Sequence, residues 1–76
     1  MALYRLYSRR GCHLCERAED VVAAILPGAD VVDVDGAPDL LVRYGTRVPV
    51  LEADGVVVVE GRFDELELMR RLRDRG

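Results

Sequence analysis

The chain has few of the side chains with which proteins bind nucleic acids. Its 76 residues include no tryptophan, one phenylalanine and one histidine, and their formal net charge is −3. Base stacking needs exposed aromatic rings, and attraction to phosphates needs an excess of positive charge. We therefore expect no nucleic-acid partner.

Long apolar runs are also missing. No stretch approaches the roughly 18 apolar residues that identify a membrane-spanning helix. The N-terminal residues Leu3 to Tyr7 mix apolar and polar types, unlike the continuous apolar segment of a signal peptide. We expect a cytoplasmic protein that has no membrane partner and acts as a monomer.

The composition is that of a folded domain. Half of the residues are apolar and a third are charged, which separates the chain from disordered sequences. A chain of this length has room for one modest hydrophobic core. We expect a single domain over residues 1–76.

Hydrophobic periodicity and turn residues divide the chain into seven elements. Leu14, Ala18 and Val22 recur at helical spacing, and Pro27-Gly28 ends that helix. Asp54-Gly55 is typical of a two-residue hairpin turn. A strand, a helix and a strand in succession imply a parallel pair joined by a crossover. The expected elements are strands at 2–7, 31–34, 48–53 and 56–60, a helix from about residue 12, a short helix or turn at 36–45, and a helix at 64–73.

Both cysteines and the only histidine fall within the five residues Gly11 to Cys15. A disulfide between Cys12 and Cys15 would close a very small loop and would add little stability. In a reducing compartment such a pair is more often catalytic or metal-binding than structural. The spacing therefore indicates chemistry.

Redox chemistry suits this arrangement. The thiolate attacks a disulfide, and the start of a helix favours a thiolate through its unpaired N–H groups and the helix dipole. Cys12 is expected at that start, as the nucleophile. Cys15 lies one helical turn further, on the apolar face, near enough to resolve a mixed disulfide on Cys12. Arg9, Arg10 and His13 would add positive charge that tunes the nucleophile.

Three other interpretations of this segment stay open. Cys12, His13 and Cys15 would bind a metal if a carboxylate or a second subunit completed the ligands, because a structural zinc site uses four. The cysteines could also be ordinary buried residues, although the C-x-x-C spacing at a helix start argues against this. His13 could be an exposed residue with no role.

Three segments resemble glutaredoxins. YSRRGCHLCERAE is similar to their active-site segment, with a tyrosine, a basic residue and C-x-x-C before a helix. YGTRVPVLEADG resembles the segment that carries valine-proline, a strand and a hairpin, and EGRFDELELMRRL resembles the final glycine, acidic pair and helix. The match covers nearly the whole chain in the same order, and it looks most like the glutaredoxin-like family of small bacterial proteins.

This resemblance implies a thioredoxin fold of the α/β class, with a four-stranded mixed sheet and helices on both faces. It also implies a cis peptide bond before Pro49. The activity it implies is thiol–disulfide exchange with a protein or small-molecule disulfide. No tightly bound cofactor is implied, and glutathione or thioredoxin reductase would supply electrons.

The resemblance also implies roles for single residues. Cys12 matches the nucleophile and Cys15 the resolving cysteine. Arg9 matches a basic residue that helps to hold a glutathione carboxylate. Val48 and Pro49 match a backbone clamp for the substrate. The residues that match the turn holding the γ-glutamyl end of glutathione are Gly61 and Asp64.

The chain departs from the glutaredoxin pattern at three places. His13 and Leu14 stand where proline and an aromatic residue are usual, and Arg47 stands where threonine usually precedes valine-proline. Arg62 replaces a second glycine, so it would either block the glutathione groove or supply a new carboxylate contact.

Two functions of other classes remain as alternatives. In one, the domain is a binding module that keeps the fold without turnover. In the other, Cys12 ligates an iron–sulfur cluster, with a second subunit and glutathione completing the ligands.

Overall fold

A computed structural model describes residues 2–75 of the chain, and its elements follow the expected order. A one-turn 3-10 helix, η1, precedes α2. The elements are β1 (Tyr4–Ser8), α1 (His13–Ile25), β2 (Asp30–Asp33), η1 (Val34–Gly36), α2 (Pro38–Tyr44), β3 (Val50–Ala53), β4 (Val56–Glu60) and α3 (Glu65–Arg75).

The four strands form one mixed sheet in the order β2-β1-β3-β4. The pair β1–β2 is parallel, with Leu6 opposite Val31. The pairs β1–β3 and β3–β4 are antiparallel, and Leu6 lies opposite Leu51 across the first of them. The mixed sheet inferred from the resemblance is therefore confirmed.

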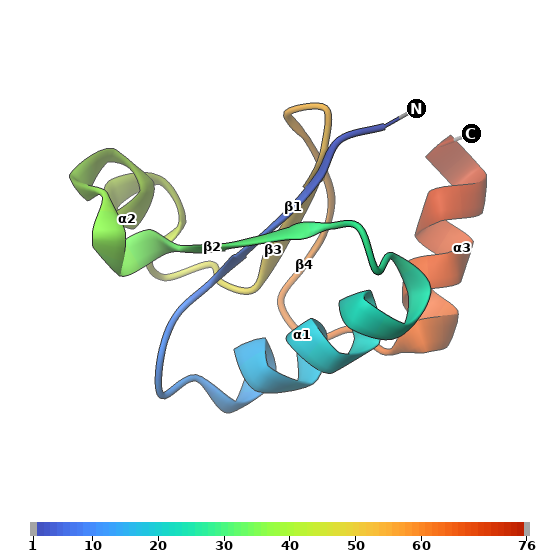
Figure 1. Ribbon diagram of the computed structural model, residues 1–76, viewed down its shortest axis with the longest axis horizontal. Coiled ribbons are helices and arrows are strands. Elements are labelled where there is room, and N and C mark those ends of the chain that lie inside the picture. Colours follow the sequence, from blue (N-terminus) through green and yellow to red (C-terminus); the bar gives the residue numbers. More distant parts are fainter. Residues whose placement is uncertain (1, 76) are drawn as a thin grey trace.

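Helices cover both faces of this sheet, as expected (Figure 1). The helices α1 and α3 share the core that contains Leu6, Leu51 and Leu68. The helix α2 closes a smaller core on the opposite face, around Tyr7 and Tyr44. Because side chains alternate along a strand, neighbouring residues of β1 and β3 serve different cores.

Several boundaries differ from the sequence expectation. Ser8, expected in a loop, ends β1 opposite Asp33 and is buried. The strand expected from Val48 begins at Val50, because Pro49 has no N–H and the Val48 N–H donates to the Tyr44 carbonyl at 3.0 Å. Val34, expected in a strand, starts the 3-10 turn instead.

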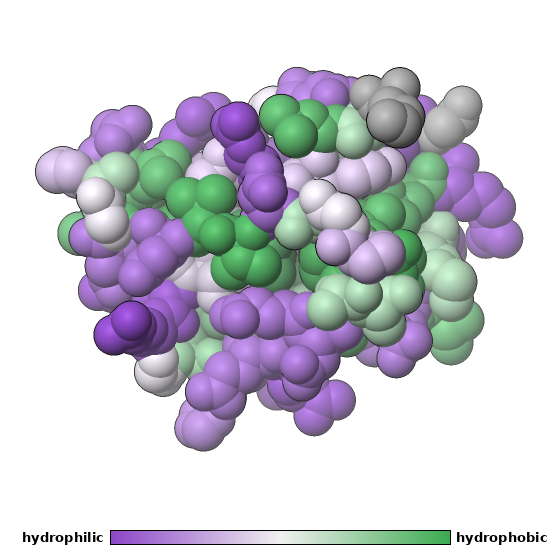
Figure 2. All heavy atoms as spheres, in the orientation of Figure 1, coloured by the Kyte–Doolittle hydropathy of each residue, from purple (hydrophilic) through white to green (hydrophobic). Residues whose placement is uncertain are grey.

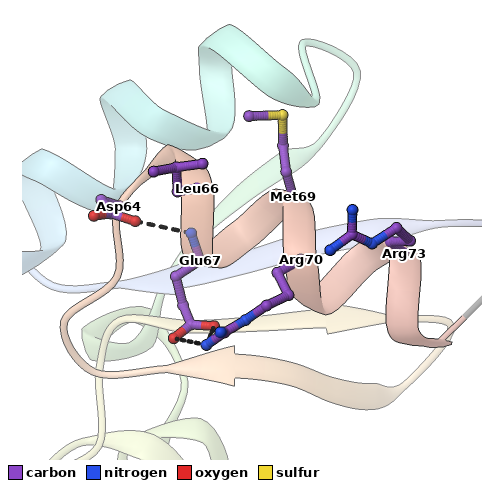
Figure 3. A pocket seen from close by; sticks show the side chains of 6 residues that line it. All are labelled: Asp64, Leu66, Glu67, Met69, Arg70 and Arg73. Atoms are coloured by element: carbon purple, nitrogen blue, oxygen red, sulfur yellow. Dashed lines mark hydrogen bonds and ion pairs between the residues drawn. The ribbon is translucent and has the colours of Figure 1, made fainter.

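Local interactions explain the turn between β3 and β4 and the start of α3. Asp54 and Gly55 both have positive φ, 52° and 84°, as the tight turn between β3 and β4 requires. At the start of α3, the Glu67 N–H donates to the Asp64 carboxylate at 2.8 Å, which caps the helix (Figure 3). The Glu67 carboxylate pairs with Arg70 along the same helix.

The surface of the molecule separates into polar and apolar regions. In Figure 2, hydrophilic residues dominate the region over α1, whereas apolar residues show near the centre of the view, where Figure 1 places β2. Glu16, Arg17 and Asp20 are exposed on α1, and Val31 of β2 is more than half exposed. Within residues 2–75, no helix has the length and apolar character needed to cross a membrane.

Candidate redox site

The two cysteines meet at the N-terminus of α1. Gly11 has a positive φ of 75°, which turns the chain from the loop into the helix. Cys12 is the N-cap residue, and its Sγ accepts the Cys15 N–H at 3.2 Å. A sulfur in this position lies against unpaired N–H groups and the positive end of the helix dipole, both of which stabilise a thiolate.

Cys15 has a different environment although it lies only one turn away. It is a free thiol like Cys12, but its side chain is 0% exposed, whereas Cys12 is partly accessible. Burial, together with a hydrogen bond to Cys12, raises the pKa of the Cys15 thiol from 9.0 to about 11. The pair therefore combines an accessible sulfur with a protected one that keeps its proton at neutral pH.

This protection predicts a pH-dependent loss of stability in the reduced protein. The folded state holds the Cys15 proton up to about pH 11, whereas the unfolded chain releases it near pH 9.0. Between these values the unfolded state binds fewer protons, so the free energy of unfolding falls as pH rises, by about 1.4 kcal/mol per pH unit. Urea denaturation of the reduced protein between these pH values measures the slope.

The matched control is Cys15→Ala. Other groups also contribute to the pH dependence, and Tyr44 is one of them, because burial and its hydrogen bond with Glu52 raise its pKa above the ordinary value of 10.0. The variant keeps those groups and lacks the thiol, so we expect its stability to fall less steeply with pH. If the stability of the two proteins fell equally steeply with pH, the Cys15 thiol would not be the cause of the extra loss.

The three residues expected to tune Cys12 lie in different environments. Arg9 forms an ion pair with Asp35, Nε to Oδ1 3.1 Å, and its Nη1 donates to the Gly45 carbonyl at 3.4 Å. It therefore ties the loop to η1 and to the end of α2. Arg10 is exposed. The His13 side chain is 96% exposed, and its Nδ1 lies 3.7 Å from Glu16 Oε2.

The Val48–Pro49 peptide bond is cis, the isomer that the resemblance implies. Hydrogen bonds hold both residues: the Val48 N–H donates to Tyr44, and the Gly61 N–H donates to the Pro49 carbonyl at 2.8 Å. Gly61 has a φ of 74°, which favours glycine. To bind a substrate through its N–H, Val48 would have to leave its bond to Tyr44.

Two of the remaining expected site residues, Arg62 and Asp64, lie between β4 and α3, and Arg47 lies between α2 and β3. Arg47 pairs with Glu60, Nε to Oε2 2.8 Å, and its guanidinium lies 5.2 Å from the centre of the Tyr44 ring. Arg62 and Asp64 line one pocket of about 430 Å³, which also contains Arg17 of α1. Arg17 was not expected from the sequence, because only the fold brings this position of α1 next to the β4–α3 connection.

Sequence reasoning also missed a polar contact beside the cysteines. The buried Ser8 hydroxyl donates to Glu19 Oε2 at 2.6 Å. Glu19 is four residues after Cys15 and therefore on the same side of α1, and that spacing was the one available signal.

The structure also bears on whether side chains outside the cysteine pair could bind a metal ion or a larger ligand. No cluster of three or more His, Cys, Asp or Glu side chains in residues 2–75 is arranged to hold a metal ion. A hollow of about 520 Å³ on the outer side of α3 is lined by Leu66, Met69 and Arg70, among others, and contains no cysteine (Figure 3). Both cysteines lie at the start of α1, away from this hollow.

Comparison with known protein families gives one match. Residues 4–73 match the family model described as a glutaredoxin-like domain. No curated protein matches the chain.

Several solved structures are similar to the chain. The X-ray structure of the structural-genomics target protein XcR50 from X. campestris is 32% identical, with a TM-score of 0.80, and the match covers 96% of this chain and 97% of that one. A glutaredoxin from Brucella melitensis is 26% identical, with a TM-score of 0.59, over 100% and 83% of the two chains. The holo form of glutaredoxin C1 from Populus tremula x tremuloides is 22% identical, with a TM-score of 0.61, over 99% and 87%, which shows a shared fold.

Proposed function

Because this chain belongs to the glutaredoxin-like domain family, we propose that it is a thiol–disulfide oxidoreductase with Cys12 as nucleophile and Cys15 as resolving thiol. One observation carries the proposal. An accessible sulfur caps α1 and accepts an N–H bond at 3.2 Å, while the second sulfur is fully buried one turn away. This asymmetry suits a two-step exchange.

The reaction begins when the Cys12 thiolate attacks one sulfur of a disulfide. A bond forms from Cys12 to that sulfur, the original S–S bond breaks, and the other sulfur leaves as a thiolate. The Cys15 thiolate then attacks Cys12, which forms the Cys12–Cys15 disulfide and releases the second thiolate. The two electrons that reduce the substrate come from the dithiol, and an outside reductant restores it.

Substrate binding is proposed for residues around the cysteines. The backbone at Val48 and Pro49 would align the substrate, as in strand addition, with the Val48 N–H leaving the Tyr44 carbonyl when substrate binds. Gly61, Arg62 and Asp64 would hold the γ-glutamyl end of glutathione. Arg62 shares a pocket with Arg17, which supports a carboxylate contact, and the carboxylates of Asp64 and Glu67 line the same pocket. Arg9 and Arg47 would act mainly by positioning loops, because each is already paired with a carboxylate.

We propose that the partner is a disulfide in a protein or a small molecule, with glutathione or a reductase as electron donor. No tightly bound cofactor is needed for the exchange, because both electrons come from the two thiols. Each of the two steps uses residues of one chain, so the monomer is sufficient.

Trapping the mixed disulfide tests which sulfur reacts first. The Cys15→Ser protein, treated with oxidised glutathione, is expected to gain one glutathione on Cys12, because Cys15 is no longer present to resolve it. The Cys12→Ser protein is the matched control, and we expect no adduct because Cys15 is buried and its pKa is raised to about 11. Intact-protein and peptide mass spectrometry identify the modified residue.

An adduct on Cys15 in the Cys12→Ser protein, formed as fast as the one on Cys12, would reverse the assigned roles. The absence of an adduct from both variants, combined with no reaction toward protein disulfides, would favour the binding module.

A further inference from the structure

The backbone donor assigned to the substrate clamp is occupied in the free protein. The Val48 N–H donates to the Tyr44 carbonyl at 3.0 Å, and the Arg47 N–H donates to the same carbonyl at 2.8 Å. A donor that is already bonded within its own chain is not available for the first bond of strand addition. The clamp therefore has a closed arrangement, which a substrate has to open.

The Arg47 side chain ties this closed arrangement to the sheet. Its Nε donates to Glu60 Oε2 at 2.8 Å, and its guanidinium lies 5.2 Å from the centre of the Tyr44 ring. Glu60 is the last residue of β4 and lies opposite Val50 of β3. The side chain that precedes the clamp thus contacts both the end of α2 and the end of β4.

Opening the clamp requires Arg47 to move. The Val48 N–H belongs to the planar peptide group that joins Arg47 to Val48, so turning this N–H outward rotates the backbone at Arg47. The Arg47 side chain resists that rotation because it is held at both Glu60 and Tyr44. The ion pair therefore favours the closed arrangement.

The contacts beneath this ion pair are much better protected. The Tyr44 hydroxyl donates to the buried Glu52 carboxylate, and the Pro49 carbonyl accepts a backbone N–H at 2.8 Å. By contrast, the side chains of Arg47 and Glu60 are 46% and 41% exposed. Solvent and salt weaken an exposed pair. The pair can therefore open while α2 and Pro49 stay in place.

We propose that Arg47 and Glu60 are positioning residues that form a latch on the Val48 clamp and set its substrate selectivity, a role that rests on the proposed oxidoreductase function. A disulfide that binds only through its sulfurs reacts without opening the latch. A disulfide that binds through a peptide backbone needs the open arrangement, so its affinity is reduced by the fraction of molecules that are open. The latch therefore lowers the preference for peptide disulfides over small ones.

Two matched substrates separate these cases. Both are mixed disulfides with the same coloured aromatic leaving thiol; one carries a short uncharged peptide with blocked ends, and the other carries an alkyl group that has no amide. In both, Cys12 bonds to the non-aromatic sulfur and the aromatic thiolate leaves with the electron pair of the broken bond. Stopped-flow absorbance at increasing peptide concentration gives the dissociation constant and the rate of attack separately.

Glu60→Gln removes one partner of the latch without changing the clamp segment. We expect the dissociation constant of the peptide substrate to fall by about 2- to 5-fold, the range that one exposed ion pair supports, with the rate of attack and the reaction of the alkyl substrate unchanged. Asp20→Asn removes one exposed carboxylate from α1 and is the matched control. In an Arg47→Gln protein, the further change Glu60→Gln is expected to have no effect, because the pair is already absent.

Hydrogen exchange of the Val48 amide, measured by NMR, provides an independent readout. Exchange requires the bond to Tyr44 to open, so its rate in Glu60→Gln should rise by the same factor as the peptide affinity. The Gly61 N–H, which donates to Pro49, should keep its rate. A general loosening of the structure would raise the exchange rates of both amides.

The outcomes that overturn the latch differ from those that overturn the oxidoreductase. An unchanged or higher dissociation constant for the peptide in Glu60→Gln, an equal change for both substrates, or faster Val48 exchange without tighter peptide binding would each overturn the latch while the oxidoreductase function stands. If the wild-type protein reacted with neither substrate, both proposals would be wrong.

Discussion

Cys12→Ser is expected to lower kcat/KM toward a small glutathione mixed disulfide by roughly 10³-fold or more, as removal of a nucleophile does in other enzymes. The reason is positional. Cys12 caps α1, is partly accessible and accepts the Cys15 N–H, whereas Cys15 is buried. Serine at position 12 keeps the cap but has no sulfur to form the mixed disulfide.

Cys15→Ser is the informative partner variant. With excess glutathione, an outside thiol can resolve the mixed disulfide on Cys12, so turnover should persist. Toward a protein disulfide, where release depends on the second cysteine, we expect the same variant to lose most of its activity. A coupled assay with glutathione, and an insulin-reduction assay, provide the two measurements.

Two other outcomes would change these assignments. If Cys12→Ser retained wild-type turnover, the assignment of the nucleophile would be wrong. If the wild-type protein turned over the protein disulfide with a reductase but left the glutathione substrate unused, the dithiol mechanism would hold and glutathione would be excluded as the physiological donor.

Glu52→Ala is expected to lower the free energy of unfolding by about 3–5 kcal/mol, a large part of the stability of a small domain. Glu52 is 4% exposed on β3. Its Oε1 accepts the Tyr7 hydroxyl at 3.2 Å, and its Oε2 accepts the Tyr44 hydroxyl. Removing the carboxyl group leaves two buried hydroxyls without an acceptor, at about 1–3 kcal/mol each, and a cavity beside them.

This cluster also supports the site. Tyr44 ends α2, and its backbone carbonyl accepts the N–H groups of Arg47 and Val48, at 2.8 and 3.0 Å. Loosening α2 from the sheet would therefore release the segment that precedes Pro49. We expect the Glu52→Ala protein to lose affinity for its substrate before it loses the reactivity of Cys12.

Chemical denaturation of three proteins tests the stability prediction. The triple variant Tyr7→Phe, Tyr44→Phe, Glu52→Leu replaces all the polar partners with apolar groups, and we expect it to recover most of the lost stability. Val42→Ala changes a side chain that is 90% exposed and should shift stability by less than about 0.5 kcal/mol. If Glu52→Ala lost no more stability than Val42→Ala, the Glu52 carboxylate and the hydroxyls of Tyr7 and Tyr44 would not be coupled.

The sequence by itself determined the order of the elements and the place of the candidate site. Helical spacing after Cys12, the Asp54-Gly55 turn and the strand runs are local signals, and each element formed within a few residues of its expected position. The C-x-x-C pair was recognisable because a helix start and a one-turn spacing are both properties of adjacent residues.

Only the tertiary structure decided which polar groups meet. Ser8 contacts Glu19, and Glu52 lies between Tyr7 and Tyr44, because strands and helices distant in the sequence pack together. Arg9 pairs with Asp35 across the loop, and its role in holding a glutathione carboxylate stays a prediction. Such pairings depend on strand register and on how the helices pack. Hydrophobic periodicity predicts which face of an element is buried, but it does not predict which residue lies opposite.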